Sequence, residues 1–126
     1  MKNYLDYTVN ILEELLNIPS PSGDTSKIIG IVKHHFADLG LKTKINAKNG
    51  LVVEVKGEIE DKVKVISAHV DTLGAMVKEI KSNGRLRIAQ IGGYSWHTVD
   101  GENCTISTME GQKYTGTILF DKTSVH

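Results

Sequence analysis

Apolar residues near the start of the chain recur every three or four positions, which is the spacing of one face of an amphipathic helix. Residues 3–16 therefore predict a helix, with Asn3 as a cap for its first turn. We expect one face of this helix to be buried, and its stripe consists of Leu5, Val9, Leu12 and Leu16. The segment Ile18-Pro19-Ser20-Pro21-Ser22-Gly23 ends the helix, because each proline lacks an amide hydrogen and restricts the residue before it.

A second run of helical spacing covers residues 24–39, with Gly40 just past its end. Its apolar stripe is formed by Ile28, Val32, Phe36 and Leu39. His34 and His35 are neighbours within this run, and helical geometry points neighbouring side chains in different directions. We interpret them as a solvated or partly buried pair and not as a metal site.

Beyond the helices, the pattern changes to short runs that are typical of strands. Residues 42–46 and 51–56 predict a hairpin, and Asn49-Gly50 between them marks a tight turn because both residues tolerate a positive φ angle. A charged loop at 57–62 precedes the apolar run 63–68, which predicts a buried strand. Two helices followed by strands favour an α/β layer.

After Gly74 the runs alternate between apolar and polar positions, as in sheets with one solvated face. They predict two hairpins, one from residues 76–81 and 85–91 and one from residues 102–108 and 112–120. No helix is predicted in this part of the chain.

These patterns predict an α/β protein in two parts. Residues 1–73 are expected to form an α/β layer, and residues 74–126 a small β-rich segment that resembles part of a barrel.

Composition excludes several classes of function. Fifteen basic residues balance fifteen acidic ones, so no overall field attracts nucleic acid or an anionic membrane. No apolar run approaches the roughly 20 residues that span a bilayer, and the N-terminus lacks a signal-peptide core. We expect a cytoplasmic protein without nucleic-acid or membrane partners. Cys104 is the only cysteine, which excludes an internal disulfide and a multi-cysteine zinc site within one chain.

The strongest candidate for chemistry is His69-Val70-Asp71, which follows the predicted buried strand. Open α/β sheets place ligands and catalytic groups at the carboxyl ends of their strands. Residues i and i+2 of an extended chain face the same way, so Asp71 could hold one ring nitrogen of His69 while the other faces a metal ion. The two side chains could equally bond each other and cap loop amides, and spacing alone leaves both interpretations open.

A hydrolytic metal site needs at least three protein ligands and usually a general base. The remaining candidates for these roles are weaker. We interpret His97 as an ordinary surface histidine, Trp96 as a packing anchor and Cys104 as a small core residue. Walker, Rossmann and Gly-x-Ser-x-Gly motifs are absent.

Taken together, the motifs resemble the start of the M42 metallo-aminopeptidases, a family that includes glutamyl and deblocking aminopeptidases and the tetrahedral TET peptidases. The resemblance spans nearly the whole chain in the family's order. Its pieces are residues 15–23 with Pro-Ser-Pro-Ser-Gly, Asn49-Gly50-Leu51, residues 67–77 with His-Val-Asp-Thr-Leu-Gly, Ile91-Gly92-Gly93-Tyr94, and residues 101–106. The His-x-Asp element alone also occurs in the wider zinc exopeptidase clan.

The resemblance implies a dinuclear enzyme that removes N-terminal residues from peptides. Two divalent metal ions, zinc or cobalt, would occupy a complete site, where they polarise the scissile carbonyl and activate a water. By position, His69 corresponds to a metal ligand and Asp71 to the catalytic-site carboxylate that orients it. Residues 1–73 would be the N-terminal part of a zinc-exopeptidase-like catalytic domain, and residues 74–126 part of a β-rich domain that assembles a homo-oligomer.

The family carries its bridging aspartate, its catalytic glutamate and its remaining ligands in a later segment than this chain reaches. No residue here corresponds to them, so we predict a truncated portion that is inactive alone. One alternative is a non-enzymatic assembly module, because uncovered strand edges and apolar faces favour association. Another is a polysaccharide hydrolase, but glycoside cleavage needs two flanking carboxyl groups, and no such pair is recognisable.

Overall fold

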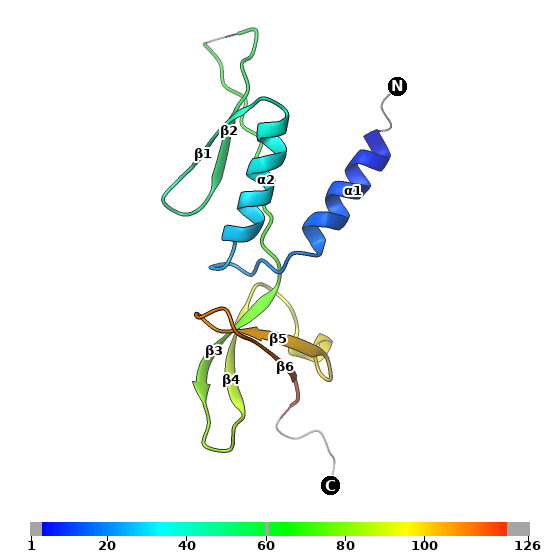
Figure 1. Ribbon diagram of the computed structural model, residues 1–126, viewed down its shortest axis with the longest axis vertical. Coiled ribbons are helices and arrows are strands. Elements are labelled where there is room, and N and C mark those ends of the chain that lie inside the picture. Colours follow the sequence, from blue (N-terminus) through cyan, green and yellow to red (C-terminus); the bar gives the residue numbers. More distant parts are fainter. Residues whose placement is uncertain (1–3, 60, 121–126) are drawn as a thin grey trace. The chain divides into compact units, whose positions relative to one another are not determined.

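The computed structural model describes residues 4–59 and 61–120, whose helices and strands are drawn in Figure 1. The chain divides into two compact units, Met1–Gly92 and Gly93–His126. The first unit contains α1 (Tyr4–Leu16), α2 (Ser26–Asp38), β1 (Lys42–Ile45), β2 (Leu51–Glu54), β3 (Gly74–Ile80) and β4 (Leu86–Ile91). The second contains the 3₁₀ turn η1 (Trp96–Thr98), β5 (Asn103–Ser107) and β6 (Lys113–Thr117).

Both predicted helices are confirmed, and the part of the chain that the structure describes contains no α-helix after α2. The predicted cap Asn3 lies outside the described residues. Helix α2 follows Thr25 and is succeeded by Leu39 and by Gly40, whose φ of 74° lies in the left-handed region that favours glycine. Within the described ranges, neither helix combines the length and apolarity that a bilayer crossing requires.

The prediction that the Leu5, Val9, Leu12 and Leu16 stripe of α1 is buried is wrong. All four side chains are at least half exposed, and Leu5 retains 70% of its accessible surface. Helix α1 instead turns an adjacent face toward α2, where an apolar cavity of about 210 Å³ is lined by Tyr7, Ile11, Leu15, Val32, His35, Phe36 and Leu39. Periodicity identifies an apolar face, but burial of that face requires a partner surface, and no described element covers it.

The core of the first unit is a small aliphatic cluster. Ile18, Ile28 and Ile29 are its buried members. The partly buried residues packed against them are Leu15, Ile31, Val32, Leu51 and Val70. Helix α2 packs on the β1–β2 hairpin, so the cluster joins the helices to this hairpin and to the segment that carries His69.

The β1–β2 hairpin is antiparallel, with Lys42 opposite Glu54 and Ile45 opposite Leu51. Asn49 has a φ of 61°, as the turn signal predicted, whereas Gly50 lies outside the positive-φ region. The connection is longer than a two-residue turn and is organised by Asn46, whose Oδ1 accepts hydrogen bonds from the amides of Lys48 (2.9 Å) and Gly50 (2.8 Å). The side-chain acceptor thus stabilises the loop as an Asx turn does.

The prediction of a buried strand at 63–68 is wrong in this chain. The segment forms no strand, and Val63, Val65 and Ile66 are 85%, 83% and 96% exposed. An apolar run favours burial, but a strand also needs a hydrogen-bonded neighbour, and β1 and β2 pair only with each other among the described strands. The chain is held in place just after this segment, by the Ser20 hydroxyl bond to the Val70 carbonyl oxygen and by a parallel bridge between Pro21 and Thr72.

Both predicted C-terminal hairpins are confirmed. β3 pairs with β4 antiparallel, with a register shift between Val77 and Glu79, and β5 pairs with β6 from Asn103–Thr117 to Ser107–Lys113. The described residues form three separate two-stranded sheets. The α/β content agrees with the prediction, whereas the barrel-like arrangement and the functional boundary between residues 73 and 74 remain predictions.

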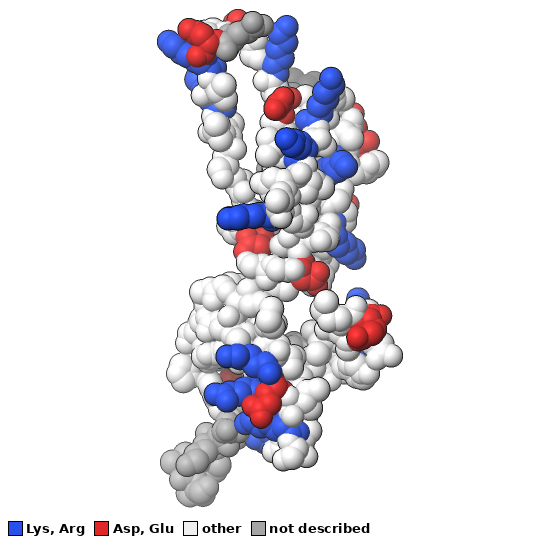
Figure 2. Space-filling view, turned by 90° about the vertical axis from the view of Figure 1, so that its left-hand side faces the viewer, with Lys and Arg blue, Asp and Glu red and all other residues white. Residues whose placement is uncertain are grey.

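Charged side chains of both signs are mixed on the surface. On the face that Figure 2 shows, basic and acidic side chains occur side by side in each charged region. This distribution follows the overall balance of fifteen basic and fifteen acidic residues.

Candidate metal centre

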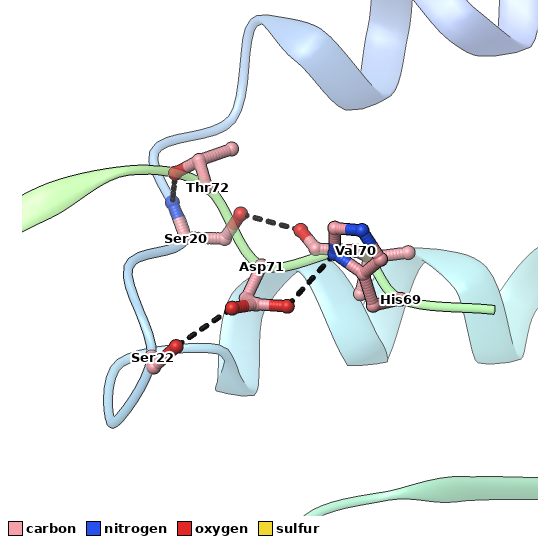
Figure 3. A network of polar contacts seen from close by, with 6 residues as sticks. All are labelled: Ser20, Ser22, His69, Val70, Asp71 and Thr72. Atoms are coloured by element: carbon pink, nitrogen blue, oxygen red, sulfur yellow. Dashed lines mark hydrogen bonds and ion pairs between the residues drawn. The ribbon is translucent and has the colours of Figure 1, made fainter. Parts of the chain in front are cut away.

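The candidate site lies where the loop after α1 meets the segment that leads into β3 (Figure 3). The Thr72 amide donates to the Ser20 carbonyl oxygen (2.9 Å), and the Ser20 amide donates to the Thr72 hydroxyl (3.2 Å). Gly74 permits this close approach, since a Cβ at that position would lie 2.7 Å from Cβ of Pro21. Two segments about fifty residues apart are therefore held together by reciprocal hydrogen bonds.

Ser20 and Val70 fix the backbone on either side of this contact. The Ser20 side chain is fully buried, and its hydroxyl donates to the Val70 carbonyl oxygen at 2.8 Å. The Val70 side chain packs against the aliphatic cluster. Because side chains alternate along an extended chain, anchoring Val70 inward leaves His69 and Asp71 on the outer side.

His69 and Asp71 make the contact that their spacing predicted. Nδ1 of His69 lies 3.0 Å from Oδ1 of Asp71, and the second carboxylate oxygen, Oδ2, accepts a hydrogen bond from the Ser22 hydroxyl at 2.7 Å. The Ser22 hydroxyl bond holds the pKa of Asp71 below its ordinary value, partial desolvation opposes this, and the His69 bond adds to the lowering. The carboxyl group is therefore ionised at neutral pH.

This arrangement determines which nitrogen of His69 is available. An ionised carboxylate only accepts hydrogen bonds, so Nδ1 of the neutral ring must carry the proton and donate it to Asp71. Nε2 then bears the lone pair, and no described residue bonds to it. The His69 side chain is 84% exposed, which leaves that lone pair accessible to a ligand from outside the described residues.

The donor chemistry fits one metal ligand with its supporting carboxylate. Metal-bound histidines commonly donate their second ring N–H to a carboxylate, which fixes the tautomer and raises the basicity of the ligating nitrogen. Within residues 4–59 and 61–120, no group of three or more histidine, cysteine, aspartate or glutamate side chains could hold a metal ion. The described residues thus offer one candidate ligand and not a complete set.

The other histidines that the structure describes, and Trp96, have ordinary structural partners. His34 is exposed, with Nε2 3.6 Å from Asp38, and Nε2 of His35 lies 2.7 Å from Glu14. The exposed His97 packs its ring at 60° on Phe120, while Trp96 makes an edge contact with Tyr94. These contacts agree with the interpretation of these side chains as surface or packing residues.

Sequence reasoning missed the three hydroxyl residues of the site, Ser20, Ser22 and Thr72. The two serines were interpreted only as part of a helix-ending loop, and Thr72 received no role. Their partners lie 49 to 52 positions away along the chain, so local periodicity carries no information about these contacts. The one available signal was the recurrence of serine in the proline-rich loop at residues 18–23.

The sequence is similar to a known protein family and to several curated proteins. A model of the M42 glutamyl aminopeptidase family matches residues 49–126. The aminopeptidase candidate YhfE of Bacillus subtilis (strain 168) is 44% identical over 119 residues, which cover 94% of this chain and 34% of that protein. The glutamyl aminopeptidase of Lactococcus lactis subsp. cremoris (strain MG1363) is 27% identical over 103 residues, which cover 81% of this chain and 29% of that protein.

Solved structures share the same fold. A TET aminopeptidase from the marine sediment archaeon Thaumarchaeota archaeon SCGC AB-539-E09 superposes with a TM-score of 0.82 at 19% identity, covering 95% of this chain and 33% of that one. PhTET1-12s, described as a dodecamer in the asymmetric unit, gives a TM-score of 0.75 at 27% identity, with 89% of this chain and 33% of that one covered.

The family model and the curated relatives that the chain matches are those of aminopeptidases. The chain belongs to the M42 family and corresponds to the N-terminal part of its members. It spans about one third of the length of the curated relatives that it matches.

Proposed function

We propose that this chain supplies one metal ligand and its orienting carboxylate to a dinuclear metallo-aminopeptidase that removes N-terminal residues from peptides in the cytoplasm. The observation that carries the proposal is the chain of contacts from Ser22 through Asp71 to His69, which leaves Nε2 of His69 unprotonated and accessible. Family membership supports the same activity.

Each residue has a separate task in the proposed site. His69 offers Nε2 as a ligand, and Asp71 holds Nδ1–H so that the ring keeps the required tautomer. Divalent zinc or cobalt, two ions in a complete site, would supply Lewis-acid polarisation of the peptide carbonyl and an activated water. The remaining ligands and the general base would come from sequence that the longer relatives have in addition.

A hybrid enzyme tests this proposal. In the hybrid, this chain replaces the segment of Bacillus YhfE to which it is 44% identical. We expect the hybrid to hydrolyse an aminoacyl p-nitroanilide, to lose this activity with a chelator, and to recover it with zinc or cobalt. The chain by itself should show no turnover, because its described residues provide a single ligand.

The activity of the unmodified YhfE protein, assayed in parallel, is the reference value. The same replacement in the Lactococcus glutamyl aminopeptidase provides a second hybrid. A folded hybrid that is inactive in both scaffolds, or that remains active after complete metal removal, contradicts the proposal. Turnover by the isolated chain that is lost with chelator would contradict the inactivity of this portion.

We also propose that the chain takes part in a homo-oligomer. The observations are two uncovered apolar surfaces, the α1 stripe and the extended run with Val63, Val65 and Ile66. Contiguous exposed apolar side chains of this kind mark association surfaces. Light scattering after size-exclusion chromatography should give a mass of at least twice the 13.8 kDa of one chain. A stable monomer at high concentration would contradict assembly through these surfaces.

A further inference from the structure

The orientation of His69 depends on very few contacts. Its side chain is 84% exposed, so packing does not confine the ring, and among the described residues its hydrogen bond to Asp71 is the contact that does. The Asp71 side chain is itself 41% exposed, so packing confines it only in part. A carboxylate held at one oxygen can rotate and withdraw the other. What holds the second oxygen therefore decides how firmly the ring is held.

We propose that Ser22 is a positioning residue, whose hydroxyl holds Oδ2 of Asp71 so that Oδ1 stays on Nδ1 of His69 and Nε2 remains unprotonated. Figure 3 shows the two bonds on opposite oxygens of one carboxylate, with Ser22 on one side and the imidazole on the other. The inference rests on the proposed role of His69 as a metal ligand. It adds a residue that touches neither metal nor peptide.

Ser22 can act in this way because its own backbone is fixed. It lies within a turn in which the Asp24 amide donates to the Pro21 carbonyl oxygen at 2.8 Å. Gly23 occupies the third position of this turn with a φ of 98°, the left-handed conformation that a type II turn requires there. Pro21 is bridged to Thr72, next to Asp71. The hydroxyl is thus presented from a turn that is bound to the same segment as its acceptor.

Loss of the hydroxyl removes the side-chain hydrogen bond that holds Oδ2 of Asp71. The ring can then leave Asp71, and an unrestrained neutral imidazole carries its proton mainly on Nε2, where it blocks metal binding. The structural contacts of Ser20 with Val70 and Thr72 do not involve the Ser22 hydroxyl and should survive. The change should therefore alter the tautomer of His69 without altering the fold.

The test measures the tautomer of His69 by ¹⁵N NMR of the imidazole nitrogens in this chain, at a pH where the ring is neutral. His69→Ala assigns the signals. In the parent chain we expect the Nδ1–H form to predominate. Ser22→Ala should shift the population toward Nε2–H and weaken zinc binding at His69 by about 10-fold, the size typical of an outer-shell change. Ser82→Ala, at an exposed serine in the β3–β4 turn, should change neither quantity.

A pair of isosteric variants covers the case in which Ser22→Ala disturbs the loop. Ser22→Thr keeps the hydroxyl and Ser22→Val replaces it by a methyl group, so only the valine variant should shift the tautomer. An unchanged tautomer in both Ser22→Ala and Ser22→Val, or an equal shift in the threonine and valine variants, overturns the inference. The tautomer is measured by NMR and needs no catalytic turnover. Failure of the Ser22 inference can therefore be distinguished from failure of the proposed peptidase activity, which the hybrid assay tests.

Discussion

Replacement of His69 by alanine in the hybrid enzyme should lower kcat/KM by about 10³-fold, which corresponds to roughly 4 kcal/mol of lost transition-state stabilisation. The physical reason is that His69 is the described residue whose Nε2 is both accessible and set in the ligating tautomer by Asp71. Removal of the ring takes away one of the few ligands of a metal site and leaves its orienting carboxylate without a partner. Steady-state kinetics with saturating zinc or cobalt measure the effect.

His34→Ala is the matched control for this experiment. His34 is also exposed, with 77% of its side-chain surface accessible, but its neighbour is Asp38 on the same helix. Its replacement should leave kcat/KM within a factor of about two, as expected of a surface change away from the site. The metal-ligand role of His69 would be excluded if His69→Ala and His34→Ala behaved alike in a hybrid whose parent is active and chelator-sensitive.

Ile28→Ala should destabilise this chain by about 2–5 kcal/mol, which is the range for deletion of a buried aliphatic side chain. Ile28 is 2% exposed and belongs to a cluster with only two other buried members among the described hydrophobic residues, Ile18 and Ile29. A core of this size contributes limited stability, so the loss is a large share of the total. Urea denaturation followed by far-UV circular dichroism measures the free energy of unfolding.

Ile59→Ala provides the comparison for the core variant. Ile59 is 64% exposed and loses little burial on truncation, so its cost should stay within about 0.5 kcal/mol. Ile28→Val should fall between the two variants, near 0.5–1.5 kcal/mol. Equal unfolding midpoints for Ile28→Ala and Ile59→Ala would show that this cluster is not the stabilising core of the first unit.

The core variant also links stability to the candidate site. Val70 packs against the same cluster as Ile28, and the Val70 carbonyl accepts the buried Ser20 hydroxyl. The position of His69 and Asp71 therefore depends on packing that lies behind them. This dependence explains why two exposed side chains can be held in a defined relation.

Local structure could be predicted from the sequence, because it depends on residues that are close together along the chain. Helical spacing predicted α1 and α2, and alternation with turn residues predicted the hairpins β1–β2, β3–β4 and β5–β6. The i, i+2 relation likewise predicted the contact between His69 and Asp71, since an extended backbone places both side chains on one side.

Contacts between distant segments could not be predicted from the sequence, because no local pattern specifies which surfaces meet. The apolar run at 63–68 predicted a buried strand, yet it is exposed without a hydrogen-bonded neighbour among the described residues. The apolar stripe of α1 was identified, but not the fact that an adjacent face turns toward α2.

By itself, the sequence determined the two helices, the three hairpins and an imidazole paired with a carboxylate, because backbone geometry over a few residues is enough to specify each of them. Only the tertiary structure brought Ser22 to the second oxygen of Asp71 and Ser20 to the backbone of Val70. Those contacts form because packing of the isoleucine cluster and the Pro21–Thr72 bridge bring the two segments together, and that is a property of the folded chain.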